Sequence, residues 1–319
     1  MILDNSTNDF EYLRISLTDR CNLRCLYCMP PGGVKKISHS SIISYEEILK
    51  IVRASVKNGV FRVRVTGGEP LVRKGVENFI SRLREIPEIK DLSLTTNGVF
   101  LMEKASDLVS SGLMRVNISL DSLNPDTYKK ITRCGELSEV LIGIFRALEV
   151  GLNPVKINVV LIPGMNDSEI LDFADFAFKN SVHVRFIEKM PFAGSNKNDF
   201  ISQSEIINTI STKYFLFPES NYIGGGPAKL FSIENGRGKI GFISSHTQPF
   251  CSTCKRLRLS AEGFLMPCLD ARSGVFTRGK TEEELTGIIR ELGIQKRYLS
   301  KKCAEFHDAG CFSLSSIGG

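Results

Sequence analysis

The chain has 319 residues, of which 42% are hydrophobic, and a formal net charge of +6. This size suits a large α/β unit with an appendage, and the modest excess of Lys and Arg fits an anionic ligand as well as nucleic acid. There is no long basic run, no apolar stretch of about 18 residues and no signal-peptide pattern, so we expect a cytoplasmic protein without nucleic-acid or membrane partners.

Strand-like and helix-like segments alternate through the first two thirds of the chain. The predicted strands are Tyr12–Thr18, Phe61–Thr66, Asp91–Thr96, Arg115–Asp121, Pro154–Ile162 and Val182–Glu188. The predicted helices are Tyr45–Lys57, Gly75–Glu85, Leu101–Ser111, Leu137–Val150, Asp167–Asn180 and Ser202–Ser211. Six strand–helix units in series predict a parallel α/β sheet, either curled or open.

The predicted strands alternate polar and apolar residues, whereas buried parallel strands are usually continuous apolar runs. In the second strand, for example, Val63 and Val65 share one face while Arg62 and Arg64 share the other. The apolar faces can pack on the helices, so the polar faces converge inside an open lumen that suits a polar ligand. An amphipathic antiparallel sheet with one wet face is the alternative, and the intervening helices disfavour it.

The pattern changes after residue 216. Two strands are predicted on either side of the Asn235-Gly236 turn signal, a second hairpin in RLRLSAEGFLM, and a charged helix over Thr281–Leu292. We therefore divide the chain into a partial barrel, residues 1–216, and a C-terminal α+β region, residues 217–319.

Nine cysteines cluster at close spacings, which indicates metal ligation in a reducing compartment rather than disulfides. Cys21, Cys25 and Cys28, the first triad, lie in DRCNLRCLYCMPPG. Structural zinc requires four closed ligands, whereas a [4Fe–4S] cluster held by three cysteines leaves one iron open for the amine and carboxylate of a small molecule. Zinc completed by His39 and scattered structural thiols are the alternatives.

A second triad consists of Cys251, Cys254 and Cys268. The second CxxC pair of a zinc ribbon is absent, so a second cluster with an open iron is favoured over zinc completed by His246. The cysteines that fit neither triad, which we expect to be small buried hydrophobes, are Cys134, Cys303 and Cys311.

The motif CNLRCLYC, followed by TGGEP at the end of the second predicted strand, resembles the signature of the radical S-adenosylmethionine (SAM) superfamily. Over nearly its whole length the chain resembles, more narrowly, the GTP 3′,8-cyclase family of molybdenum cofactor (molybdopterin) biosynthesis. The segments that carry this resemblance are YLRISLTDRCNLRCLYCMP, RVTGGEPLVRKG, LTTNG, VNISLDSL, VKINVVLIPGMND, RFIEKMP, SSHTQPFCSTCKRLRLSAEGFLMPCL and the terminal SIGG. The resemblance implies an incomplete (β/α)6 TIM-type barrel whose open side is closed by the C-terminal region.

The resemblance also implies the chemistry of a lyase with two [4Fe–4S] clusters and SAM as cofactors. The cluster on the first triad would cleave SAM to a 5′-deoxyadenosyl radical, which takes the hydrogen from C3′ of GTP. The resulting radical would attack C8 of guanine, giving (8S)-3′,8-cyclo-7,8-dihydroguanosine 5′-triphosphate, while the second cluster holds the purine through its open iron. The implied partners are GTP, an electron donor and a downstream cyclic pyranopterin monophosphate synthase, and a homodimer is compatible with the family.

Site residues follow from the same resemblance, which assigns no catalytic side chain. The SAM contacts would be Tyr27, Gly68, Ser119 and Met190. The GTP contacts would be Arg14, Arg64, Thr95, Lys156, Arg256, Leu257 and Arg258. The terminal Gly318 and Gly319 would enter the active site. The segments that depart from the family pattern are Arg62, where Lys is common, and the loosely matching residues 191–200 and 297–310.

Two other functions are compatible with parts of the sequence. A different radical SAM enzyme with an auxiliary cluster, such as a peptide-modifying maturase, would share both cysteine triads. A non-enzymatic iron–sulfur or zinc sensor would share the cysteines alone. The single C-terminal triad and the double-glycine tail favour the cyclase over the first, and TGGEP together with the polar strand faces favours it over the second.

Overall fold

The computed structural model describes residues 9–33, 36–189, 200–219, 226–245, 247–269, 271 and 273–302. The residues discussed above that lie outside these ranges are Met190, His246, Cys303, Cys311, Gly318 and Gly319.

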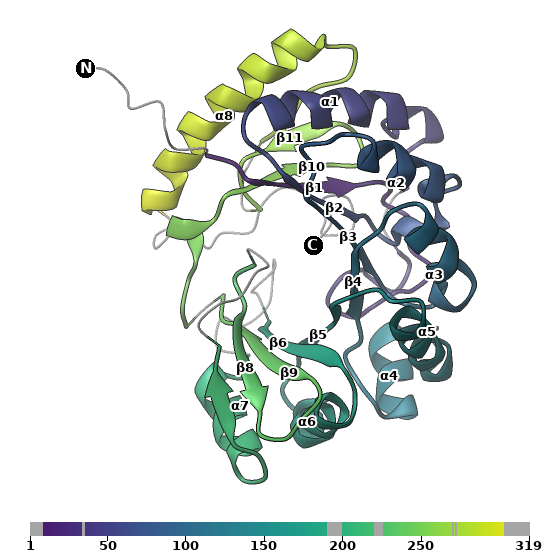
Figure 1. Cartoon of the computed structure of the whole chain (residues 1–319), viewed down its shortest axis with the longest axis vertical. Coiled ribbons are helices and arrows are strands. Elements are labelled where there is room, and N and C mark those ends of the chain that lie inside the picture. Colours follow the sequence, from purple (N-terminus) through teal and green to yellow (C-terminus); the bar gives the residue numbers. More distant parts are fainter. Residues whose placement is uncertain are drawn as a thin grey trace.

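Six parallel strands form the centre of one mixed sheet, as the sequence predicts. They are β1 (Tyr12–Ser16), β2 (Arg62–Thr66), β3 (Asp91–Thr96), β4 (Arg115–Ser119), β5 (Val155–Leu161) and β6 (Val182–Glu188). Each pairs with the next in parallel, and the sheet curves with its helices on the outer side, giving a partial barrel (Figure 1).

The connecting helices match the predicted ones closely, except for α4, which was not predicted. They are α1 (Tyr45–Lys57), α2 (Val76–Arg84), α3 (Leu101–Ser110), α4 (Pro125–Thr132), α5 (Leu137–Glu149), α6 (Ile170–Lys179) and α7 (Gln203–Ser211). Short 3-10 turns are found at His39–Ser41, Pro70–Val72, Asp167–Glu169 and Cys251–Thr253. The side chains of Ser44 and Ser202 accept from the backbone N–H groups of Glu47 and Glu205, which fixes the starts of α1 and α7.

The predicted alternation decides which strand face meets the helices. Leu13, Ile15, Val63 and Val65 are fully buried in the core between sheet and helices. Their polar neighbours therefore lie on the inner, concave face of the sheet.

The C-terminal region extends the sheet at both of its edges. Its elements are β7 (Leu216–Pro218), β8 (Lys229–Ile233), β9 (Lys239–Ile243), β10 (Arg256–Leu259), β11 (Phe264–Met266), β12 (Val275–Phe276) and α8 (Glu282–Lys302). Both predicted hairpins form: β8 pairs with β9, and β10 with β11. In the described part of the chain the strand order is β12-β11-β10-β1-β2-β3-β4-β5-β6-β9-β8-β7, so β10 borders β1 and β9 borders β6.

Candidate active site

The first triad lies in the loop that follows β1, at the carboxyl end of the parallel strands, and its thiols are free and partly exposed. The end of α4 supports this loop, because Arg133 donates from Nη1 to the carbonyl oxygens of Arg24 (2.7 Å) and Met29 (2.8 Å). His39, the alternative zinc ligand, instead places its Nε2 2.7 Å from Nη1 of Arg20. The loop that carries the three cysteines is therefore anchored to the end of α4, and His39 has a different partner.

The environment of the first triad disfavours thiolates that have no metal bound. Burial, and then the nearby Cys21, raise the pKa of Cys28 to about 11, and burial also raises the pKa of Cys21 and Cys25. Thiolates packed this closely need positive charge, which iron supplies. Within the described residues no three His, Cys, Asp or Glu side chains surround a single metal ion, whereas the cysteines of a cubane cluster each bind a different iron.

The glycines of TGGEP hold the segment that leads into the first triad. The N–H of Gly68 donates to the carbonyl of Thr18 (2.6 Å), and a Cβ at Gly68 would lie 2.4 Å from the carbonyl oxygen of Arg20. A Cβ at Gly67 would lie 2.8 Å from the same oxygen of Thr18. The structure shows that the chain's own backbone occupies the space a side chain would need.

Glu69, which is not among the residues predicted from the sequence, links this segment to β3. Its buried carboxylate accepts from the N–H of Asn97 (2.7 Å) and from Oγ1 of Thr96 (2.8 Å). Burial raises the pKa of Glu69 to about 7 against the lowering effect of these hydrogen bonds. Asn97 in turn donates from Nδ2 to Oδ1 of Asn22 (2.7 Å), inside the cysteine loop. Glu69 thereby fixes the loop relative to the sheet.

Tyr27, a predicted SAM contact, is held by a buried carboxylate. Its hydroxyl donates to Oδ2 of Asp121 (2.6 Å), whose Oδ1 accepts from the N–H of Val160 (2.8 Å). Burial raises the pKa of Asp121 to about 6. Ser119, the last residue of β4, lies two residues before Asp121. Ser119, a predicted SAM contact, and Asp121, the partner of Tyr27, therefore lie at the same end of the sheet.

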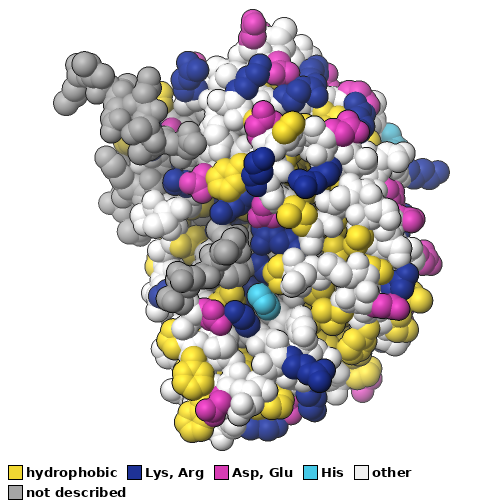
Figure 2. All heavy atoms as spheres, in the orientation of Figure 1, with side chains coloured by type: hydrophobic (Ala, Val, Ile, Leu, Met, Phe, Trp, Pro, Cys, Tyr) yellow, Lys and Arg dark blue, Asp and Glu magenta, His cyan; other side chains and the backbone are white. Residues whose placement is uncertain are grey.

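The concave face of the sheet is strongly basic. Arg14 lies between Arg64 and Arg258 in the strand register, and Arg256 lies one step along β10 on the same face. Burial, and then the charge of Arg258, hold the pKa of Arg14 well below its usual range. Lys156 is only 1% exposed, and its pKa falls to about 6 because of burial and of the surrounding arginines. In the orientation of Figure 1, Lys and Arg side chains gather near the middle of the molecule (Figure 2).

The structure places two further basic residues on the concave face that were not predicted from the sequence. Arg115 and Arg185 are buried, and Nη2 of Arg185 donates to Oδ1 of Asn117 (2.7 Å). The same polar–apolar alternation that marked β2 is present in β6 and could have identified Arg185. Leu257, by contrast, is fully buried in the core on the opposite side of β10, so its side chain does not reach the concave face.

Several buried polar atoms on the concave face have no hydrogen-bond partner in the described part of the chain. They are the hydroxyl of Tyr12, Oγ1 of Thr95, Oδ1 of Asn158, Nδ1 of His183 and Nε of Arg185. Unsatisfied buried polar groups are costly, and so many on one face indicate a site for a polar ligand. The excess of Arg and Lys there favours an anion that carries several charges.

The second triad lies beyond the amino end of β10. Cys254 and Cys268 have free, partly buried thiols, and Cys251 is disulfide-bonded in this structure. Burial would raise the pKa of Cys254, but Arg256 and Lys296 outweigh that effect and lower it. The positive charges around Cys254 thus favour a thiolate, the form that binds iron.

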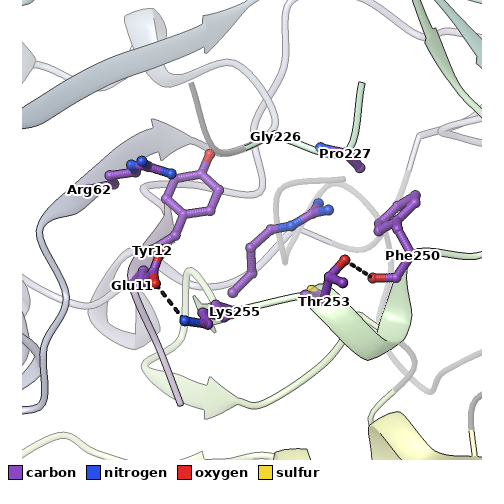
Figure 3. A pocket seen from close by; sticks show the side chains of 10 residues that line it. Glu11, Tyr12, Arg62, Gly226, Pro227, Phe250, Thr253 and Lys255 are labelled. Atoms are coloured by element: carbon purple, nitrogen blue, oxygen red, sulfur yellow. Dashed lines mark hydrogen bonds and ion pairs between the residues drawn. The ribbon is translucent and has the colours of Figure 1, made fainter. Parts of the chain in front are cut away.

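A cavity of about 350 Å³ adjoins Cys254. Figure 3 shows Tyr12 and Arg62 on one side of it and Phe250 and Thr253 on the other. The guanidinium of Arg256, which also lines the cavity, lies 5.0 Å from the centre of the Phe250 ring. The cavity therefore offers a planar guanidinium, from Arg256, and an aromatic ring, from Phe250, next to the thiol of Cys254.

Comparison with known protein families gives two matches that together cover most of the chain. Residues 15–177 match the model of the radical SAM superfamily, and residues 182–301 match that of "Molybdenum Cofactor Synthesis C". A protein of Petrotoga mobilis named GTP 3′,8-cyclase is 47% identical over 324 aligned residues, covering 100% of both chains. One of the same name from Desulforamulus reducens is 47% identical, covering 94% of this chain and 91% of that protein.

Solved structures share the fold at low sequence identity. SuiB of Streptococcus suis bound to its precursor peptide SuiA aligns with a TM-score of 0.66 at 15% identity, covering 97% of this chain and 76% of that one. The structure titled "Native anSMEcpe with bound AdoMet" aligns with a TM-score of 0.60 at 18% identity, covering 97% and 88%. At these identities the likeness concerns the fold alone.

Proposed function

The chain belongs to the GTP 3′,8-cyclase family of the radical SAM superfamily, which carries out the first step of molybdenum cofactor biosynthesis, and we propose that its concave face holds GTP between the two cysteine triads. The observation that carries this proposal is the run of buried Arg and Lys side chains between the triads, with unsatisfied polar atoms among them. The full-length relatives named as cyclases disfavour the maturase alternative.

Cys21, Cys25 and Cys28 would hold a [4Fe–4S] cluster with one iron open for SAM, and that cluster would supply the electron for reductive cleavage of SAM. Tyr27 would contact SAM while its hydroxyl is fixed by Asp121. Gly68 would contact SAM through its backbone, and Ser119 would contact SAM from the end of β4. Because Glu69 ties the cysteine loop to β3, SAM would meet groups whose positions are set before it binds.

Lys156 would bind the triphosphate of GTP, together with Arg14, Arg64 and Arg258. Lys156 and Arg258 are buried and Arg14 and Arg64 are half-buried. Each lies close to other basic side chains, so an anion with several charges would relieve their mutual repulsion. Thr95 would offer a hydroxyl that has no hydrogen-bond partner among the described residues. The purine would then point toward the cavity beside Cys254, where Arg256 and Phe250 provide a guanidinium and an aromatic face.

The second triad would hold a second [4Fe–4S] cluster, whose open iron would bind the purine. Two of its thiols are free, and the cationic setting of Cys254 supports ligation. Cys251 would have to be reduced to complete the set, since it is disulfide-bonded here. Anaerobic, reducing reconstitution is therefore the condition under which this cluster is expected.

We further propose the partners and location that the family implies. These are a one-electron donor, a synthase that consumes the cyclised nucleotide, a homodimeric assembly and the reducing environment of the cytoplasm. None of the helices in the described part of the chain combines the length and hydrophobicity needed to cross a bilayer.

The reaction is tested with GTP that carries deuterium at C3′. Anaerobic incubation with SAM and dithionite should place deuterium in 5′-deoxyadenosine and yield 3′,8-cyclo-7,8-dihydroguanosine triphosphate, identified by mass and NMR. Deuterium-free 5′-deoxyadenosine together with unchanged GTP would contradict hydrogen abstraction from C3′ by this protein.

A further inference from the structure

Lys296 occupies a position on α8 where an apolar side chain would be expected. Leu285, Ile289 and Leu292 are buried along one side of this helix, and Lys296 continues their spacing one turn further. It is only 6% exposed. A lysine in the buried stripe of a helix is costly unless its ammonium has a specific partner.

The ammonium of Lys296 contacts the two chain segments that carry the second triad. Nζ lies 3.4 Å from Sγ of Cys254 and donates to the carbonyl oxygen of Pro267 (2.8 Å), the residue before Cys268. The helix also packs against the turn Cys251–Thr253. One buried cation thus links the two parts of the second triad that are separated by β10 and β11.

The partners of Lys296 suit a ligated sulfur. In the described part of the chain its hydrogen-bond partners are the Cys254 sulfur and the carbonyl oxygen of Pro267. A cysteine that ligates iron would give the buried ammonium a negatively charged partner. The geometry therefore fits an anionic cluster better than a free thiol.

We propose that Lys296 is a positioning residue for the C-terminal cluster, donating an N–H···S hydrogen bond to Cys254 and raising the reduction potential of that cluster. This inference rests on the proposed second cluster. Hydrogen bonds to the sulfurs and nearby positive charge both stabilise the reduced, more negative state of an iron–sulfur cluster. The contact with Pro267 would also keep the two cysteine segments together while iron is bound.

The test compares K296M and K296R with the wild type in the full-length, reconstituted protein. R290M is the matched control, because Arg290 is exposed on the same helix and the substitution removes the same charge. Iron and sulfide are counted per chain, and EPR-monitored redox titration follows the signal that responds to GTP rather than to SAM. We expect K296M to lower the ratio of reduced to oxidised C-terminal cluster about tenfold at a fixed potential, a shift of about 59 mV for one electron. K296R and R290M should stay near the wild type.

The outcomes separate the two proposals. Selective loss of C-terminal iron in K296M with retention in K296R would also support the role of the charge. Unchanged potentials in K296M, or equal loss of iron from K296M and K296R, would overturn it while leaving the second cluster in place. A wild-type protein that binds only one cluster after reducing reconstitution would overturn the second-cluster proposal, and the role of Lys296 with it.

Discussion

Replacing Lys156 by Met is expected to stabilise the protein without ligand and to abolish its binding of GTP. Lys156 is 1% exposed and lies among Arg64, Arg115 and Arg185, so its ammonium has a low pKa of about 6. The unfolded chain keeps this group near its ordinary value of 10.5. Between those two values the unfolded state binds more protons than the folded state, so this lysine makes stability rise with pH across that window.

The magnitude follows from the same pKa values. At pH 7.5 a lysine with an ordinary pKa is three units below its midpoint, and giving up its proton on folding costs about 4 kcal/mol. Methionine has a similar length and carries no charge, so K156M should gain stability up to about that amount. The same substitution removes an amine from the proposed triphosphate site, where a bound polyanion would favour the protonated form and a charge-assisted contact.

The assay combines denaturant unfolding at pH 7 and pH 9 with calorimetric titration of GTP. K156M should be more stable than the wild type at pH 7, with a smaller difference at pH 9, and should show no measurable GTP binding. K213M is the control, because Lys213 is exposed and paired with Asp175 on the surface, and it should change neither result. A K156M protein that is less stable at pH 7 and binds GTP like the wild type would refute both the buried-charge argument and the site.

Three further outcomes are expected. Replacing all three cysteines of the second triad by Ala should halve the iron content while SAM cleavage continues; zinc in that site of anaerobically purified protein would contradict the assignment. R258A should lose cyclisation but keep some uncoupled formation of 5′-deoxyadenosine, and normal GTP binding with both clusters present would show that the basic face is not the GTP site. Deleting the two terminal glycines should leave stability and iron content nearly unchanged yet collapse cyclisation, because correct placement can contribute several kcal/mol to lowering a barrier; full-rate turnover by the truncated protein would argue against a role for the tail.

The alternation of polar and apolar residues made most of the sheet predictable. It located β3 and β6 to the residue and assigned Arg14, Arg64 and Lys156 to one face, because side-chain direction along a strand depends only on local geometry. The helix α4 was missed because it is eight residues long, too short for helical periodicity to be evident. Its signals were the Asn124 cap and Pro125 at the first helical position.

The placement of the C-terminal strands could not be predicted. The hairpins follow from local turn signals, but whether β10 joins β1 or another strand depends on contacts between residues more than 200 positions apart. The same limit applies to Lys296, whose sequence position shows only a lysine in a charged helix. Its contact with Cys254 arises from the packing of α8 on the rest of the fold.

Hyperfine spectroscopy with ¹⁵N-labelled GTP is the most direct test of the proposed placement of GTP between two clusters. We predict that the reduced C-terminal cluster couples to a nitrogen of the purine, and that the coupling disappears when the second triad is replaced by Ala. GTP that is bound to the protein but shows no ¹⁵N coupling to either cluster would contradict the account.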